Sequence, residues 1–380
     1  MKDSKRRICY ITGTRADFGL MQSTLVRIQK SEALELSMVV TGTHLSAEHG
    51  STVEEIISAG LLVSEMVRLN LTDSTGAAMA RNIGVMISSF VDAFEKIRPD
   101  VVLLLGDRGE MLAGALAAIH LNIPVAHIHG GERSGTVDEP VRHAISKLSH
   151  IHFVATDDSR DRLIRMGEHA SSVFVTGAPG LDGLSELITS TKASLCEEVG
   201  FDPRLRTALF VFHSVLQEAD RAGTHATNVM EALVGHGLQI IALMPNSDAG
   251  SESVRHALRQ FEHHEKIRLL IHLPRGKFIS WMAACDVMVG NSSSGIIEAA
   301  TFGTPVINIG IRQNLRQRNV NVVDVEPETA TVQKAVNTAL QHGRFSLENF
   351  YGDGRAGERI AGYLAKLPLT PELLLKFNAY

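Results

Sequence analysis

The chain contains 380 residues, of which 44% are hydrophobic and 21% are charged, and its formal net charge is −5. This length exceeds what one hydrophobic core usually spans, so we expect two domains. The net negative charge supplies no general basic field, which argues against nucleic acid as a partner.

The cysteines and the apolar runs indicate the cellular compartment in which the protein is expected. Cys9, Cys196 and Cys285 lie far apart and form no CxxC pair, which predicts reduced thiols in the core. The basic N-terminus leads into a short strand-like segment and not into an apolar signal core. No apolar run reaches the roughly 18 to 20 residues that a membrane span needs. We therefore expect a cytoplasmic protein with no membrane partner.

In chain order, short β-branched runs alternate with amphipathic stretches, a pattern typical of βαβ units and a parallel sheet. The first set of predicted strands covers residues 8–12, 36–41, 101–105, 125–129 and 173–177. After a polar stretch near 185–204, the second set covers residues 208–213, 238–245, 267–274, 287–291 and 305–310. The stretch 356–380 has a helical pattern and no further strand.

Two successive sets of this kind predict an α/β protein with two doubly wound, Rossmann-like domains and a cleft between them. We expect an N-terminal domain at 1–183 and a C-terminal domain at 184–355, with the helix at 356–380 packing back on the first. Ligands bind such sheets at the carboxyl ends of the strands. The residues that follow each predicted strand are therefore the candidate site, and most of them are polar.

The segment GNSSSGIIEA, starting at Gly290, has the pattern of a phosphate cradle. A strand ends in glycine, a serine-rich turn follows, and a helix beginning near Ser294 would present free N–H groups and a positive dipole end. Ordinary helix capping by serine is the alternative. Glu298, one turn into the helix, could reach a ribose hydroxyl pair, and Arg312 follows the next strand. Together these favour a nucleotide diphosphate.

Two weaker patterns have simpler alternatives. GTRADFG, residues 13–19, is a glycine turn without the full GxGxxG motif. Its Arg15 could face a phosphate or a sugar, or could pair with Asp17. The chain has 17 histidines, and alternation would place His127 and His129 on one face of a strand. No Cys or carboxylate stands at a recognised metal spacing from them, so packed imidazoles are favoured over a metal site.

A group of titratable residues lies on the N-terminal side of the predicted cleft. Asp107 follows a buried strand and Asp138 opens a helix, so both carboxylates can face the cleft with pKa values that burial and charge move apart. Arg142, one turn after Asp138, could pair with it. A structural ion-pair network is the alternative. His129 and Glu132 belong to the same group.

At these residues the sequence resembles the hydrolysing UDP-N-acetylglucosamine 2-epimerases of sialic acid synthesis and their relatives that act on UDP-diacetylbacillosamine for legionaminic acid. The matching pieces run in family order from about residue 8 to 320. They are TGTRADFG, VTGTHLS, LLGDRGE, HIHGGERSGTVDEPVRHAISKLSHIHF, GAPGLD, FH at 212–213, MPNSDAGSES, GNSSSGIIEA and INIGIRQ.

The resemblance implies a GT-B-like arrangement in which UDP lies on the C-terminal domain and the sugar faces the N-terminal one. Family roles in nucleotide binding then fall on Arg15, Asn246, Asp248, Ser292, Ser293, Gly295, Glu298 and Arg312, with His213 near the phosphates. Asp107 and Asp138 would be the acid/base groups, accompanied by His129, Glu132, Arg142 and His213. The chain departs from the family at His129, where many members have Glu, at Ser214-Val215-Leu216 and at Arg275-Gly276-Lys277-Phe278.

The implied reaction converts UDP-N-acetylglucosamine into UDP and N-acetylmannosamine through 2-acetamidoglucal. The same reaction on UDP-diacetylbacillosamine is the alternative, and further rivals are a non-hydrolysing epimerase, a glycosyltransferase and a non-catalytic UDP-sugar sensor. HIHGGERSGTVD differs from the HVEAGLR-like stretch of the non-hydrolysing branch, and a sensor has no use for Asp107 and Asp138. The resemblance implies no cofactor, no metal, and a homodimer or homotetramer.

Overall fold

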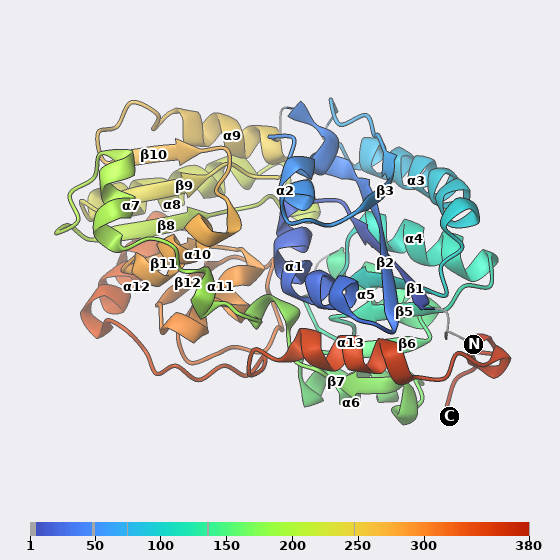
Figure 1. The fold of residues 1–380 in the computed structure, drawn as a ribbon. Helices are drawn as coiled ribbons and strands as arrows, with labels where there is room; N and C mark the ends of the chain where they lie inside the picture. Colours follow the sequence, from blue (N-terminus) through green and yellow to red (C-terminus); the bar gives the residue numbers. More distant parts are fainter. Residues whose placement is uncertain (1–4, 48–49, 74, 135–136, 247, 380) are drawn as a thin grey trace.

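The structure is a computed structural model that describes residues 5–47, 50–73, 75–134, 137–246 and 248–379. Of the predicted site motifs, Gly135, Thr136 and Ser247 lie outside the described residues. Figure 1 shows two lobes side by side, each built around its own sheet with helices on both faces. The predicted two-domain, doubly wound α/β fold is confirmed.

The N-terminal lobe contains a seven-stranded sheet among its described residues, in the order β3-β2-β1-β4-β5-β6-β7, with every pair parallel. The strands are β1 (Arg6–Thr12), β2 (Leu34–Thr41), β3 (Val63–Val67), β4 (Val101–Leu105), β5 (Val125–Ile128), β6 (Ile151–Val154) and β7 (Val173–Val175). The helices between them are α1 (Arg15–Lys30), α2 (Val53–Ser58), α3 (Gly76–Ile97), α4 (Gly109–His120), α5 (Asp138–Leu148) and α6 (Asp157–Arg165).

The C-terminal lobe repeats this plan with a parallel six-stranded sheet, as far as the described chain shows, in the order β10-β9-β8-β11-β12-β13. The strands are β8 (Thr207–Val211), β9 (Gln239–Leu243), β10 (Ile267–Leu270), β11 (Val287–Gly290), β12 (Val306–Ile309) and β13 (Val322–Val325). The helices are α7 (Lys192–Val199), α8 (Ala222–Gly235), α9 (Ser251–Arg259), α10 (Arg275–Ala284), α11 (Ser293–Ile297) and α12 (Thr329–His342).

The central strands are apolar on both faces because helices cover both sides of each sheet. In β1, Ile8 and Tyr10 pack into the core under α1, while Cys9 and Ile11 pack into the core under α3 and α4. This alternation follows from the two-residue period of a strand. The three cysteines are free and buried, as predicted.

The final helix, α13 (Ala356–Lys366), runs along the N-terminal lobe and not along the lobe that precedes it in sequence (Figure 1). Ile360 and Leu364 enter the core of that lobe. Asp182 accepts hydrogen bonds from the backbone N–H groups of Ala356 (2.8 Å) and Gly357 (2.6 Å), which fixes the start of the helix. The division of the chain at residue 183 stays a prediction.

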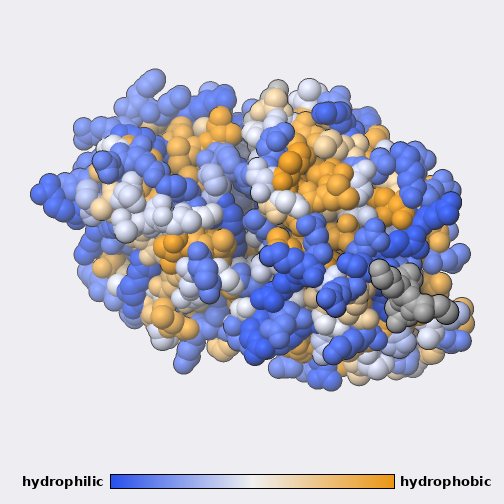
Figure 2. Space-filling model, viewed as in Figure 1, coloured by the Kyte–Doolittle hydropathy of each residue, from blue (hydrophilic) through white to orange (hydrophobic). Residues whose placement is uncertain are grey.

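Each sheet has a point where the strand order reverses, between β1 and β4 in one lobe and between β8 and β11 in the other. Loops diverge at such points and leave room for a ligand at the carboxyl ends of the strands. Figure 2 shows the surface hollowed along the seam between the lobes. No helix in the described part of the chain is both long and apolar enough to cross a membrane.

Candidate active site

Asn291 organises the C-terminal side of the cleft. It follows Gly290, whose φ of +135° and closeness to β8, where an added Cβ would lie 2.0 Å from the carbonyl oxygen of Val211, admit only glycine. The side chain of Asn291 accepts a hydrogen bond from the N–H of His213 (2.8 Å) and donates one to the His213 carbonyl (2.8 Å). The loops after β8 and β11 are thereby locked together.

The same asparagine holds the loop after β12. Its carbonyl accepts hydrogen bonds from Arg312 Nη1 (3.1 Å) and Gln313 Nε2 (2.9 Å). Burial, together with the charge of Arg312, lowers the pKa of His213 to about 3. His213 is therefore neutral near pH 7, and the predicted phosphate-side residues His213 and Arg312 are brought together on one asparagine.

The helix that follows the serine-rich turn is shorter than the sequence pattern predicted. Ser292 caps α11, with its Oγ accepting from the Ser294 N–H, but the α-helix ends at Ile297, so its dipole is small. Gly295 donates its N–H to the Ser292 carbonyl, and an added Cβ would lie 2.9 Å from Val306. Gly295 therefore serves close packing of the turn on β12.

Glu298 lies at the end of α11, a turn beyond Ser294, and is almost fully buried. Its Oε1 pairs with Arg275 from α10, and its Oε2 has no hydrogen-bond partner among the described residues. Across the cleft, the buried Nη1 atom of half-buried Arg15 likewise lacks a hydrogen-bond partner within the described chain. Asp17 instead caps α1 through the Thr14 N–H (2.8 Å). One acceptor and one donor are thus left for a ligand.

Asp248 links the lobes. Its carboxylate lies 3.5 Å from Arg108 Nη2 of the N-terminal lobe and accepts a hydrogen bond from Asn246 Nδ2 (2.6 Å). Burial opposes ionisation of Asp248, but the charges of Arg108 and Arg312 lower its pKa. An ionised carboxylate repels phosphate, so we expect Asp248 to orient Arg108 and Asn246.

Asp107 and Asp138 form the acidic part of the N-terminal side. Asp107 follows β4 and forms an ion pair with Arg142 of α5, the arginine that the sequence analysis considered as a partner of Asp138. Burial would raise the pKa of Asp107, but the charges of Arg142, Arg316 and Arg312 outweigh it and lower that pKa. Burial and the charge of Asp107 raise the pKa of Asp138, the first residue of α5. The pKa values of the two carboxylates are moved in opposite directions.

Glu132 is the buried centre of a second charged group. Its Oε1 pairs with His129 Nδ1, and its Oε2 lies 2.9 Å from Arg316 Nη2 of the C-terminal lobe. Burial opposes ionisation, but Arg316 and His129 lower the pKa of Glu132. His129 lies past the end of β5 with a φ of +64°, so the predicted alternation with His127 ends there.

His127 connects the loop that carries Asp107 to helix α5. Its Nε2 donates to the carbonyl of Gly106 (2.7 Å), the residue before Asp107, and its Nδ1 lies 3.1 Å from Ser146 Oγ on α5. Burial lowers the pKa of His127 to about 3, which keeps it neutral. Among the described residues, no group of three His, Cys, Asp or Glu side chains could hold a metal ion.

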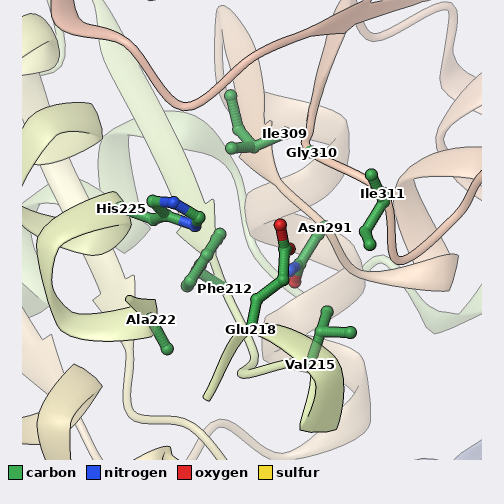
Figure 3. Close-up of a pocket in the computed structure, with 9 residues that line it drawn as sticks. All are labelled: Phe212, Val215, Glu218, Ala222, His225, Asn291, Ile309, Gly310 and Ile311. Atoms are coloured by element: carbon green, nitrogen blue, oxygen red, sulfur yellow. The ribbon is translucent and has the colours of Figure 1, made fainter. Parts of the chain in front are cut away.

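A small pocket opens beside the loops that follow β8, β11 and β12 (Figure 3). Glu218 and Asn291 both line it, and His225 points in from α8. The pocket shares Asn291 with the cleft, and Ile309, Gly310 and Ile311 of the β12 loop also line it. It therefore borders the segment that carries Arg312.

Arg108, Asn291 and Gln313 follow predicted strands but were given no role in the sequence analysis, and Arg316 was missed. Asn291 stands inside the quoted GNSSSG motif and could have been found from its place after a strand. Arg108 follows Asp107 and has the same signal. Gln313 and Arg316 lie in the loop after β12. Gln313 contacts Asn291 within its own lobe, and the sequence gives no sign that Arg316 reaches across the cleft.

Comparison with known proteins identifies the family. A family model described as UDP-N-acetylglucosamine 2-epimerase matches residues 26–365. The chain is 49% identical over 375 residues to the UDP-N,N'-diacetylbacillosamine 2-epimerase (hydrolyzing) of Legionella pneumophila, covering 99% of this chain and 100% of that protein. It is 34% identical to the UDP-N-acetylglucosamine 2-epimerase of Neisseria meningitidis serogroup B, covering 92% and 91% of the two chains.

Solved structures show the same fold. The UDP-GlcNAc 2-epimerase from Neisseria meningitidis bound to UDP-GlcNAc superimposes with a TM-score of 0.79 at 20% identity, over 95% of this chain and 100% of the other. The family model and the two relatives establish that the chain belongs to the UDP-N-acetylglucosamine 2-epimerase family.

Proposed function

We propose that the protein is a hydrolysing 2-epimerase that converts a UDP-linked 2-acetamido sugar into UDP and the free manno-configured sugar. The observation that carries the proposal is the pair of carboxylates Asp107 and Asp138, which lie across the cleft from Arg312. Their surroundings lower the pKa of Asp107 and raise the pKa of Asp138. Such divergence separates a group that stays ionised from one that more readily carries a proton.

The C2 proton of the sugar has no adjacent carbonyl and is too weakly acidic for a side chain to remove unaided. If the C1–O bond to UDP stretches first, positive charge at C1 acidifies that proton. Arg312 and the turn N–H groups at Ser292 and Ser293 stabilise the departing diphosphate, and a donor of this kind is worth about 3 to 4 kcal/mol in a closed site. Arg15 and Glu298 supply the donor and acceptor for the rest of the nucleotide.

Asp107 stays ionised beside Arg142 and stabilises the positive charge at C1, while Asp138 receives the C2 proton. The C1–O electron pair leaves with UDP, and the C2–H electron pair forms the double bond of 2-acetamidoglucal. Water then adds its oxygen to C1 and releases one proton to solvent, while another proton arrives at C2 from the opposite face. His129, beside Glu132, is a candidate for that second transfer.

Two sugars are candidate substrates, UDP-N-acetylglucosamine and UDP-diacetylbacillosamine. The relative at 49% identity over the whole chain carries the second name, and the one at 34% identity carries the first. The higher identity favours UDP-diacetylbacillosamine, the alternative of the sequence analysis, over UDP-N-acetylglucosamine, its first choice. The product from UDP-diacetylbacillosamine would be used in legionaminic acid synthesis, and the product from UDP-N-acetylglucosamine in sialic acid synthesis.

Proton NMR in deuterated water tests the reaction and the substrate together. The protein is incubated with each UDP-sugar separately, with Asp138→Asn as the inactive control. We expect release of UDP and of a free manno sugar carrying deuterium at C2, faster from UDP-diacetylbacillosamine. An epimerised sugar still attached to UDP would identify a non-hydrolysing enzyme, and no change in either sugar would contradict the proposal.

A homodimer or homotetramer in the cytoplasm completes the proposal. Ile57, Leu62 and Met66, on and beside α2 and β3, are about half exposed or more, and Figure 2 shows an apolar area over that part of the N-terminal lobe. A second copy covering such an area would remove apolar surface from water. Light scattering at micromolar concentration measures the mass, and a monomer there would contradict this part.

A further inference from the structure

Arg316 belongs to the C-terminal lobe, but its guanidinium lies against the N-terminal lobe. Nη2 is 2.9 Å from Oε2 of Glu132 and 4.0 Å from Oδ2 of Asp107. The side chain of Arg316 is 9% exposed and that of Glu132 is 3% exposed. Charges buried this deeply are costly unless they stay paired. The pair can persist only while the lobes are together.

The same guanidinium is also hydrogen-bonded to Gln313, which contacts Asn291 on the Arg312 side of the cleft. Nη1 of Arg316 donates to Gln313 Oε1 (3.0 Å), and Gln313 Nε2 donates to the Asn291 carbonyl (2.9 Å) that also accepts from Arg312. Leu315 has a φ of +64°, a strained conformation for a non-glycine residue. Arg316 therefore joins the loop that carries Arg312 to the carboxylates of the other lobe.

We propose that Arg316 is a positioning residue that couples closure of the two lobes around the diphosphate to the arrangement of Asp107 and Glu132 on the sugar side. The inference rests on the proposed function. It has a chemical consequence, because 2-acetamidoglucal is no longer bonded to UDP after elimination. Only a closed cleft then retains it until water has added.

Two substitutions and one control test this role. Arg316→Met removes the charge and the hydrogen bonds, and Arg316→Lys keeps the charge without the planar fork. Arg204→Gln is the control, since Arg204 also belongs to the C-terminal lobe but pairs with Asp202 (2.7 Å) on the exposed surface of that lobe. Turnover, the dissociation constant of UDP, and the ratio of glucal to manno sugar are measured for each.

We expect Arg316→Met to lower kcat about 100-fold, the loss that about 1 Å of misplacement can cause. UDP affinity should change far less than kcat, because Arg312 and Asn291 stay in place. The fraction of glucal released should rise. Arg316→Lys should recover part of kcat, and Arg204→Gln should match the wild type in all three quantities.

The pH profile separates positioning from a general loss of structure. The charged groups that face Asp107 are Arg142, Arg312, Arg316, Glu132 and Asp138. Removing Arg316 removes one of the charges that lower the pKa of Asp107, so the acid limb of kcat/KM should move to higher pH in Arg316→Met. It should return toward the wild-type position in Arg316→Lys. A merely structural defect lowers the profile without moving that limb.

If Arg316→Met does not fold, Glu132→Gln breaks the same pair from the other lobe with little change in shape, and it should also release more glucal. Wild-type kcat, product ratio and acid limb in Arg316→Met would overturn the proposal. If the wild type turns over neither UDP-sugar, the proposed function fails, but small-angle X-ray scattering with UDP still tests the coupling. Equal compaction of wild type and Arg316→Met by UDP would then overturn it.

Discussion

Asp107 and Asp138 are close enough for each to affect the ionisation of the other, yet their surroundings differ. Asp107 has the guanidinium of Arg142 beside it, whereas Asp138 is buried near the negative charge of Asp107. Two carboxylates in one cleft therefore have different tasks: one stays charged and the other can carry a proton. A histidine or a metal is not needed for this division.

At the residue scale we predict that Asp107→Asn and Asp138→Asn each lower turnover about 100-fold or more, the lower end of what acid–base groups contribute. The dissociation constant of UDP should stay within about twofold of the wild-type value, because neither residue lies on the Arg312 side. Turnover by NMR and UDP binding by calorimetry check this. Exposed Asp92→Asn is the matched control, and undiminished turnover in both active-site variants would remove these carboxylates from the mechanism.

At the element scale, the C-terminal segment is tied to α5, the helix that begins at Asp138. Lys376 donates to the Ser146 carbonyl (3.0 Å) in the last turn of α5, and it also lies 2.7 Å from Oε2 of Glu168. Lys147 of α5 pairs with Oε1 of Glu168 (2.7 Å). One buried carboxylate thus joins the end of the chain to the far end of a site helix.

This cluster predicts a pH dependence of stability. Burial opposes ionisation of Glu168, but hydrogen bonds from His152, Lys147 and Lys376 lower its pKa from 4.5 to about 2. A lowered pKa stabilises the fold above pH 4.5, by about 3 kcal/mol at most, and this is lost as the pH falls toward 2. The loss by pH 4 should already be about 1 kcal/mol.

Urea unfolding at pH 7 and pH 4 measures this contribution. The wild type should lose its advantage over Glu168→Gln as the pH falls, while exposed Glu231→Gln should track the wild type at both values. A difference between wild type and Glu168→Gln that is the same at pH 7 and pH 4 would show that the ion cluster contributes no pH-dependent stability.

The elements also show how far sequence reasoning extends. Strand ends were predictable because β-branched runs and the polar residues after them are local features, and Asp107, His213 and Arg312 follow β4, β8 and β12. The edge strands β3 and β13 were missed because their exposed sides carry polar residues and their apolar runs are short. The pattern overestimated α11, since the chain tightens to a 3₁₀ turn at Ala299–Phe302.

Contacts between the lobes were beyond the sequence, since no local pattern states which residue of one lobe meets which residue of the other. The ion pairs Glu132–Arg316 (2.9 Å) and Arg108–Asp248 (3.5 Å), and the polar contact Glu55–His272 (2.6 Å), all cross the seam. Each joins residues more than a hundred positions apart. Together they make the closed form of the whole molecule depend on charge.

At the scale of the whole molecule we therefore predict that Arg108→Gln raises KM for the UDP-sugar more than it lowers kcat. The Arg108 and Asp248 side chains are 27% and 20% exposed, so their pair contributes about 1 kcal/mol at most, or about fivefold in the ratio of closed to open molecules.

Raising the salt from about 0.05 M to about 0.5 M screens such pairs, so KM of the wild type should rise with salt and KM of Arg108→Gln should rise less. Arg204→Gln is the control, because Arg204 pairs with Asp202 on the exposed surface of one lobe. A salt dependence of KM equal in all three proteins would place the salt effect on UDP itself and not on lobe closure.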